Sequence, residues 1–314
     1  MADIESICAR MCLLTRAAWR PELPPPLTRP MARRLIASGA LCGLVLRAVP
    51  GVDDGLLERS ALLLSRARAV CQCLEAYRAA GYEVLLPKDA LWPQRLYVLG
   101  EQMPLLLFVR GEKALLLRRA VAVAGSRHVS AQTLERARRV GAALAREGVV
   151  MVCGGAQGVD DAAQRALLRE GGRLILVPAR PVEPLCRQEA IADALADGRL
   201  LLVCDALPDD PFSPQKAIAR NHTIYALGGA AVVLAAREGV GGSWHGATDC
   251  LRGGYAKVFV PGEELSALPG SAALHARGAQ SLDLDRPLVA QLFSHRQTSL
   301  FSGDGCGMEA DVCR

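Results

Sequence analysis

The sequence has 314 residues, of which 51% are hydrophobic and only 4% aromatic, and this size predicts two domains with aliphatic cores. The net charge of +5 is unevenly distributed, because residues 1–120 hold 17 basic and 11 acidic residues whereas residues 121–264 hold 16 of each. The second region is therefore neutral, which excludes a general basic field over it. Any nucleic-acid binding there needs locally placed Arg or Lys side chains, helix N-termini and loop amides.

Membrane and metal functions are not expected. The N-terminal residues MADIESICARMCLL are acidic where a secretory signal is basic, and the longest apolar run, residues 225–236, is too short for a bilayer, which takes about 20 residues. The eleven cysteines match neither a zinc-finger spacing nor a small disulfide scaffold. The sequence therefore predicts a soluble cytoplasmic protein with reduced thiols, no metal site and no cofactor.

Residues 1–81 are expected to form a small helical N-terminal domain. A proline-rich break at residues 21–30 follows a short first segment, and leucines and alanines recur at helical spacing over residues 54–80. The arginines between them favour a solvated face over a binding face. Residues 82–120 follow as a lead-in whose short apolar segments, 82–86 and 105–109, predict strands packed on the next domain.

From Val121 onward, apolar strands alternate with amphipathic helices. After the first strand at Val121, further strands are expected at residues 149–153, 174–177, 200–204, 230–235 and 258–260. Continuous apolar strands between such helices predict a doubly wound, mostly parallel Rossmann-like α/β sheet covered on both faces. We place this extended domain at residues 82–264. Residues 265–314 lose the periodicity and are expected to form a weakly structured C-terminal tail.

Glycine-rich loops follow three strands of this domain. In open parallel sheets, ligands lie at the carboxyl ends of the strands, where helix N-termini attract phosphate. The first loop offers a glycine, a hydroxyl and a cation, and the second offers three glycines and a carboxylate near a helix start. The candidate phosphate-binding residues there are Gly125, Ser126 and Arg127 in the first loop, and Gly154, Gly155, Gln157, Gly158 and Asp160 in the second.

Glycines in the second loop favour close approach of a phosphate or nucleotide over packing alone. The loop has neither the G-x-G-x-x-G pattern nor the G-x-x-x-x-G-K-[ST] pattern, which argues against a dinucleotide dehydrogenase and a P-loop NTPase. Asp160 has two interpretations, a helix-start residue that complements the dipole or a direct ligand or catalytic group.

The third candidate segment is split around a buried strand. Lys216 and Arg220 are spaced i, i+4, so a helix would place both on one side to grip successive phosphates, although an ordinary exposed helical face has the same pattern. Trp244 is equally suited to stacking on a base and to filling a core. The candidates here are Lys216, Arg220, Asn221 and His222 before the strand, and Gly241, Gly242, Ser243 and Trp244 after it.

Six segments follow one another between residues 82 and 262: KDALWPQRL…PLLLFVRG, VAVAGSR, CGGAQGVDDAAQRAL, ARNHTIYALGGAAVVLAA, GGSWHGA and VFVPG. In this order they resemble the DNA-processing protein A (DprA/Smf) family. The resemblance implies a Rossmann-like homodimer that binds single-stranded DNA in a basic pocket and loads the RecA recombinase on it during DNA uptake, competence, transformation and recombination. It implies pocket roles for Gly125, Ser126 and Arg127, for Gly154, Gly158 and Asp160, and for Arg220 and Asn221.

The chain departs from that family pattern at several positions. Gln157 stands where the family usually has Lys or Arg, Gln164 where it often has His, and His222 where a second Arg is typical. The later loop reads Gly-Gly-Ser-Trp in place of the commoner Ser-Gly-Ser. These differences indicate a divergent branch, in which the loss of two cations should weaken DNA binding at raised salt.

Three functions are therefore compared. The leading hypothesis is a non-enzymatic binder of single-stranded DNA. A second is a nucleotide phosphoribohydrolase, because related glycine-rich α/β enzymes, by resemblance, have a carboxylate near the position of Asp160; the fuller Pro-Gly-Gly-x-Gly-Thr-x-x-Glu signature is absent. The third is a sensor that binds a small nucleotide in the same pocket without catalysis.

Overall fold

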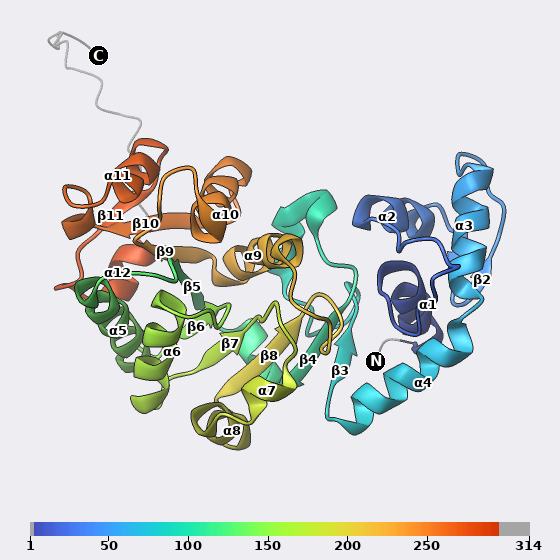
Figure 1. Ribbon diagram of the computed structural model, residues 1–314, viewed down its shortest axis with the longest axis horizontal. Helices are drawn as coiled ribbons and strands as arrows, with labels where there is room; N and C mark the ends of the chain where they lie inside the picture. The colour runs from blue at the N-terminus through green and yellow to red at the C-terminus, as the bar shows by residue number, and fades with distance from the viewer. Residues whose placement is uncertain (1–2, 295–314) are drawn as a thin grey trace, which may run out of the picture.

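The computed structural model describes residues 3–294, which contain a nine-stranded sheet with helices on both faces (Figure 1). Alternate residues of each central strand point to opposite faces, so both faces of these apolar strands are buried, as predicted for a parallel sheet. In spatial order the strands are β11 (Gln280–Leu282), β10 (Lys257–Pro261), β9 (Ala230–Leu234), β5 (Ala120–Gly125), β6 (Val150–Cys153), β7 (Leu174–Leu176), β8 (Leu200–Cys204), β4 (Leu107–Gly111) and β3 (Glu83–Leu85).

From β5 onward, the chain reverses its direction of travel across the sheet once. From β5 it adds β6, β7 and β8 on one side, and then crosses back to place β9 and β10 on the other side of β5. The strands from β11 to β8 are parallel to one another. The predicted lead-in strands extend the edge beside β8: β4 pairs antiparallel with β8, and β3 pairs antiparallel with β4. The topological switch point therefore lies between β5 and β9, where a ligand is expected.

Each face of the sheet has its own helical layer and its own apolar core. One core contains α5 (Ala131–Arg146), α6 (Val159–Arg169), α8 (Glu189–Ala196) and α12 (Leu288–Leu292). The other contains the 3-10 helix η1 (Gln94–Gln102), α9 (Pro214–Gly228), α10 (Gly241–Gly253) and α11 (Pro269–Ala276). The remaining short helices are α7 (Glu183–Cys186), η2 (Lys113–Leu117) and η3 (Gly262–Glu264). This arrangement confirms the predicted doubly wound α/β class.

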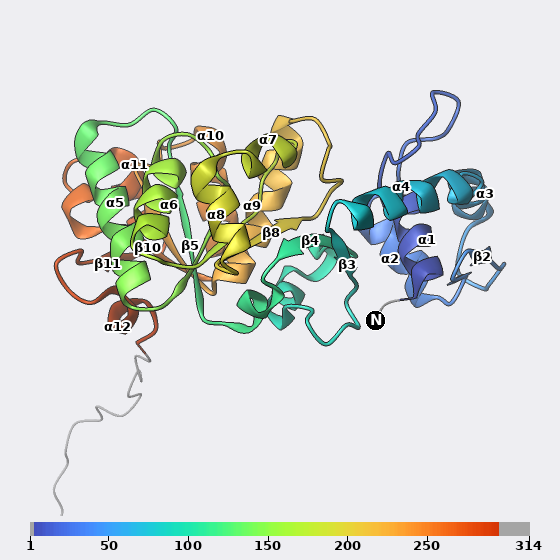
Figure 2. The same ribbon diagram turned by 90° about the horizontal axis from the view of Figure 1, so that it is seen from below.

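The N-terminal region is helical, as expected, and lies beyond the β3 edge of the sheet (Figures 1 and 2). The predicted helix over residues 54–80 is two helices, because Arg66 turns inward between them and its guanidinium donates to the carbonyl oxygens of Thr15 and Ala17 at 2.7 Å. The elements are α1 (Ile4–Leu14), α2 (Arg29–Ala37), α3 (Asp54–Leu64), α4 (Ala67–Ala79), and a small hairpin of β1 (Leu41–Cys42) and β2 (Val45–Leu46).

Residues 265–294 are more ordered than the expected weakly structured tail. β11 pairs in parallel with β10, and Glu147 at the end of α5 accepts from the backbone amides of Leu288 and Val289 at 2.9 and 2.8 Å. Short elements such as these carry little periodicity, which is why the sequence pattern missed them. The rest of that expected tail, residues 295–314, lies outside the described residues. Among residues 3–294, no helix has both the length and the apolar character needed to cross a membrane.

Candidate nucleic-acid interface

A cavity of about 610 Å³ lies at the carboxyl ends of β5 and β9, at the switch point of the sheet. It is lined by residues of the first loop (residues 125–128), the second loop (residues 153–160), the third loop (residues 236–243), and the facing sides of α9 and α10. We call it the switch-point cavity. From the residues predicted for a phosphate site, it brings together Gly125, Ser126, Arg127, Asp160, Arg220, Asn221, Gly241, Gly242 and Ser243.

The glycines of the first two loops are required mainly by packing between the loops. A Cβ on Gly125 would lie 2.5 Å from Val159 Cγ2, and one on Gly158 would lie 2.5 Å from the carbonyl oxygens of Ser126 and Arg127. Gly158 also has φ +87°, and it begins α6 directly against the first loop. The missing side chains at Gly125 and Gly158 are therefore required by packing, and close approach of a phosphate to their backbone stays a prediction.

Gly155 has a similar packing role, since its φ is +64° and a Cβ there would meet Leu176 Cδ1 at 2.8 Å. Gly154 differs. A Cβ on Gly154 would lie 1.6 Å from Nη1 of Arg220, so this glycine leaves the space in which the guanidinium of Arg220 lies. The second loop thus serves the site indirectly, by admitting a cation from α9.

Arg220 is the central charged group of the switch-point cavity. Arg220 is 8% exposed. Burial lowers the pKa of its guanidinium, while the nearby carboxylate of Asp160 opposes that shift. Among the described residues, Arg220 has no carboxylate within 4.0 Å, and its buried Nε has no hydrogen-bond partner. A buried cation without such partners raises the free energy of the folded protein, so an anion that enters the cavity beside Arg220 would be favoured.

Asp160 anchors the second loop from the first turn of α6. Its Oδ2 accepts from the backbone amides of Gly154 at 3.1 Å and Ala156 at 3.4 Å. Burial raises the pKa of Asp160 from its usual 3.8 to about 6, while the attraction of Arg220 and the two amides limits the rise. The carboxylate therefore partly balances Arg220 and positions the loop around it.

The first loop is fixed to the end of β9. Ser126 Oγ donates to the carbonyl oxygen of Ala235, so the hydroxyl proton predicted to donate to a phosphate is already used. The amide of Ala235 in turn donates to Oε2 of Glu264 at 2.9 Å, and Ser271 donates to the same oxygen at 2.8 Å. Glu264 is fully buried, and these bonds hold the ends of β5 and β9 in register. Arg127 is left as the exposed cation of the first loop.

The N-terminus of α10 forms one wall of the switch-point cavity. Val240 occupies the cap position without a capping side chain, so the first amides of α10 are free of side-chain caps. Gly241 has φ +86°, and a Cβ there would meet nothing within 4 Å, which leaves open space beside these amides. Asn221 Nδ2 donates to the carbonyl oxygen of Gly242 at 3.0 Å and so ties α9 to this turn. Free amides at the positive end of a helix favour an anion.

Seven predicted site residues do not line the cavity: the packing glycines Gly154, Gly155 and Gly158, and also Gln157, Lys216, His222 and Trp244. Lys216 pairs with Asp210 at 2.7 Å and lines a cleft towards the N-terminal helices, outside the switch-point cavity. His222 Nε2 lies 3.3 Å from Asp249 Oδ2, because two residues along α9 turn a side chain about 200° from Arg220. Gln157 is exposed at the tip of the second loop.

Trp244 is a core residue. It is 5% exposed, packs in the core under α10, and has the guanidinium of Arg277 4.9 Å from its ring centroid. The base-stacking interpretation of its indole ring is therefore wrong, and only its backbone amide, in the first turn of α10, remains near the cavity.

Several cavity residues were missed by the sequence prediction. Phe212, Ile218 and Val240 are exposed apolar side chains that line the mouth of the cavity, and the guanidinium of Arg127 lies 5.7 Å from the ring centroid of Phe212. Tyr225 lines the interior, and its buried hydroxyl has no hydrogen-bond partner among the described residues. The signal was available for Phe212 and Val240, which are large apolar residues in polar, glycine- or proline-containing loops. Tyr225 gave no such signal, because it stands at the start of the apolar run of residues 225–236.

Metal ligation has no support in the described part of the chain. Residues 3–294 contain no group of three or more His, Cys, Asp and Glu side chains placed to hold an ion.

Comparisons with known proteins agree with this fold. A model of the family "DNA recombination-mediator protein A" matches residues 83–292. DNA processing protein A from Streptococcus pneumoniae is similar in structure, with a TM-score of 0.70 and 22% identity over 94% of this chain and 99% of that one. The DNA processing protein A from Helicobacter pylori, studied for its single-stranded DNA binding mode, has a TM-score of 0.54 and 23% identity, covering 65% and 92%. No curated protein sequence matches the chain significantly.

Proposed function

Because the chain belongs to the DNA recombination-mediator protein A family, we propose that it binds single-stranded DNA in the switch-point cavity. The family consists of DNA-binding recombination mediators and not of enzymes, in agreement with the sequence prediction. Phosphates would occupy the space between Arg220, Arg127 and the first amides of α10. Gly242 and Ser243 supply those amides.

The observation that carries this proposal is the environment of Arg220. The guanidinium lines the cavity from a buried position, its Nε is unpartnered among the described residues, and the absent Cβ of Gly154 leaves room for it. Burying a cation away from water costs on the order of several kcal/mol unless an anion compensates for its charge. A phosphate entering the cavity would supply that compensation through charge-assisted hydrogen bonds.

The rim of the cavity supports an unpaired strand over a duplex. Phe212, Ile218 and Val240 place apolar surface around the mouth, where it would contact base faces. Stacking on an aromatic ring such as Phe212 contributes about 1–3 kcal/mol per base in single-strand binders. In a duplex the base faces are stacked on one another and the phosphates lie outside, so the same rim has little to bind.

The family resemblance supports three further parts of the proposal. The chain would act as a homodimer, would load the RecA recombinase on the bound strand, and would do so in the cytoplasm during DNA uptake and recombination. Size-exclusion chromatography with light scattering would test the dimer. Co-purification of RecA with the protein on oligo-dT beads, compared with beads lacking the protein, would test the interaction with RecA.

The experiment for DNA binding is a fluorescence-anisotropy titration of labelled oligo-dT at two salt concentrations. The wild-type protein should bind more weakly at the higher salt, and both Arg127→Ala and Arg220→Ala should lose most of the affinity. Unlabelled duplex DNA and nucleoside monophosphates serve as competitors. Indifference to both substitutions would refute the proposed site. Competition by a monophosphate as strong as that by oligo-dT would favour a nucleotide sensor, and release of free base would favour a phosphoribohydrolase.

A further inference from the structure

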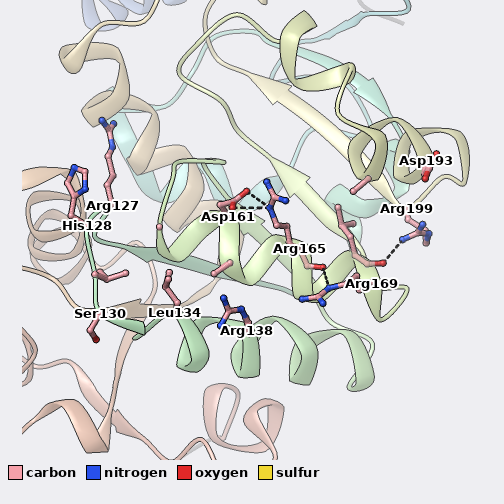
Figure 3. A pocket seen from close by; sticks show the side chains of 15 residues that line it. Arg127, His128, Ser130, Leu134, Arg138, Asp161, Arg165, Arg169, Asp193 and Arg199 are labelled. Atoms are coloured by element: carbon pink, nitrogen blue, oxygen red, sulfur yellow. Dashed lines mark hydrogen bonds and ion pairs between the residues drawn. The ribbon is translucent and has the colours of Figure 1, made fainter. Parts of the chain in front are cut away.

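A second and larger cavity lies beside the switch-point cavity, on the face of the sheet covered by α5, α6 and α8 (Figure 3). It has a volume of about 1220 Å³ and is open along the surface of α6. Residues of α6 line its length, while α5 contributes Leu134 and Arg138 on one side and α8 contributes Ala190 and Asp193 on the other. We call this surface the α6 groove.

The groove exists because α6 packs unusually close to its neighbour. A Cβ on Gly141 of α5 would lie 2.1 Å from the carbonyl oxygen of Ala163, so the two helices approach each other at a position without side chains. Ala162, Ala163 and Ala166 are buried small residues on the same helix. Small residues allow α6 to lie deep between α5 and α8, and its outward face becomes the floor of the groove.

All the cations that line the α6 groove are arginines. They are Arg127, Arg138, Arg165, Arg169 and Arg199, and they come from four separate parts of the chain. Arginine presents a planar fork of donors that matches a phosphate, whereas lysine presents a single hydrated ammonium. Asp161 and Asp193 are the carboxylates that line the same groove.

The ion pairs in the groove leave much of this charge available. Arg165 pairs with Asp161 at 2.9 Å, and Arg138 pairs with Glu135 at 3.0 Å, at exposed positions where such pairs contribute little to stability. Among the described residues, neither Arg127 nor Arg169 has a carboxylate within 4.0 Å. A phosphate could therefore displace or join these weak pairs at small cost.

The α6 groove shares one end with the rim of the switch-point cavity. Arg127 and His128 line both spaces, and Figure 3 shows them at one end of the groove, with Arg199 and Asp193 at the other. The eleven residues of α6 extend about 16 Å at 1.5 Å per residue. A chain that leaves the cavity past Arg127 thus meets a line of arginines in its path.

The floor of the groove differs from the rim of the cavity. Its apolar residues, such as Ala162 and Leu168, are aliphatic, and no Phe, Tyr or Trp lines it. Such a surface suits contacts to a sugar-phosphate backbone, and beyond His128 it offers no ring on which bases stack.

We propose that the α6 groove binds the continuation of the same DNA strand, by its phosphates, beyond the switch-point cavity. This inference rests on the proposed function and adds to it a path for the strand and a dependence on strand length. A short oligonucleotide would occupy the cavity alone, while a longer one would also reach Arg138 and Arg169. The arginines of the groove also supply positive charge to a chain that has Gln157 where the family pattern has a cation.

The test is a double variant, Arg138→Gln with Arg169→Gln, titrated with oligo-dT of about 6 and about 20 nucleotides, sizes that bracket the sites of many single-strand binders. The matched control carries Arg68→Gln and Arg286→Gln, two exposed arginines outside both cavities. The groove variant should bind the long oligonucleotide about tenfold more weakly and the short one almost normally. Its salt slope for the long one should fall by about 0.7 for each phosphate that the variant no longer neutralises.

Each outcome has one meaning. If the groove variant and the control bind the long oligonucleotide equally, with the same salt slope, the inference is wrong while the proposed function stands. If the wild type binds neither oligonucleotide, the proposed function itself is wrong. If the groove variant changes the oligomeric state measured by light scattering and leaves long-strand affinity unchanged, the groove is a contact between copies of the chain, and the inference is also overturned.

Discussion

The switch-point cavity and the α6 groove both present arginines, but they hold them in different ways. Arg220 is buried, is fixed by its packing against Gly154, and has no carboxylate within 4.0 Å among the described residues. Arg138 and Arg165 are exposed and each pairs with a carboxylate of its own helix. A buried cation positions one phosphate accurately, whereas exposed cations attract a flexible chain and respond to salt. The two regions should therefore contribute affinity by different routes.

The largest effect is expected from Arg220→Met. It removes the buried charge and keeps an apolar side chain of useful length, so oligo-dT affinity should fall about 100-fold, or about 2.8 kcal/mol. Replacing an uncompensated buried cation by an apolar residue often stabilises a fold. The urea midpoint should therefore stay the same or rise, as measured by circular dichroism.

The matched control for that variant is Lys216→Met. It removes a cation from the same helix, one turn earlier, where Lys216 already pairs with Asp210 and does not line the cavity. Its affinity for oligo-dT should change less than threefold, by about 0.6 kcal/mol or less. Equal losses in the two variants would mean that position on α9 does not matter, contrary to the geometry.

A smaller effect is expected from Gly154→Ala. The new methyl would overlap Nη1 of Arg220, and the end of this flexible side chain can move aside, so the fold should survive while the guanidinium is displaced. We expect about a tenfold loss of oligo-dT affinity, about 1.4 kcal/mol. In a double-mutant cycle the same change should cost almost nothing in the Arg220→Met background. Full additivity of the two losses would contradict the contact.

Asp160→Asn should produce an increase of a few-fold in DNA affinity and remove a pH dependence. The pKa of Asp160 is raised to about 6, so its contribution to stability is complete below pH 3.8 and is lost as the pH rises through about 6. That loss is on the order of 3 kcal/mol. Asparagine stays neutral and keeps an oxygen for the amides of Gly154 and Ala156, so its unfolding free energy should lack this decline.

The same carboxylate should also set the pH dependence of DNA binding. Above pH 6 it offsets the charge of Arg220, so wild-type affinity for oligo-dT should rise as the pH falls through about 6. Asp160→Asn should bind about fivefold more tightly at pH 7.5, about 1 kcal/mol, and show no such rise. The surface variant Asp54→Asn provides the control. Parallel pH profiles for all three proteins would rule out a role for Asp160.

The smallest effects come from restoring the two cations that the family pattern has and this chain lacks. Gln157→Arg adds a charge at an exposed loop tip beside the cavity, so affinity at low salt should rise about threefold, about 0.6 kcal/mol. His222→Arg adds one next to Asp249 and Tyr255, away from the cavity, and should leave affinity almost unchanged. A larger gain from His222→Arg, seen by anisotropy, would show that the helix face is assigned wrongly.

Sequence patterns predicted the fold correctly, and nine of the residues that they singled out for a site line one cavity. Apolar strands, amphipathic helices and loops at strand ends are local features, and they indicate the ends of β5 and β9 without any knowledge of strand pairing. The order of motifs also identified the family. What one sequence does not carry is the direction of each side chain. Lys216 and Arg220 share a helix and a spacing, yet one pairs with Asp210 and the other lies against Gly154.

Glycines were the second source of error. A glycine in a loop indicates that another group lies close to the backbone, but the sequence does not identify that group. At Gly158 the neighbour is the first loop, at Gly154 it is Arg220, and at Gly241 the space is open. The α6 groove was missed for a related reason: its arginines lie on α5, on α6 and before β8, and only the close packing of Gly141 on Ala163 makes them one surface.

The central claim is that the DNA strand occupies the switch-point cavity, and hydrogen–deuterium exchange with and without oligo-dT tests it most directly. The first amides of α10 have no intrahelical partners and should exchange rapidly in the free protein. Oligo-dT should slow exchange over residues 124–128 and 240–245, and should not do so in Arg220→Met. Saturating oligo-dT that leaves both segments unprotected would contradict the account.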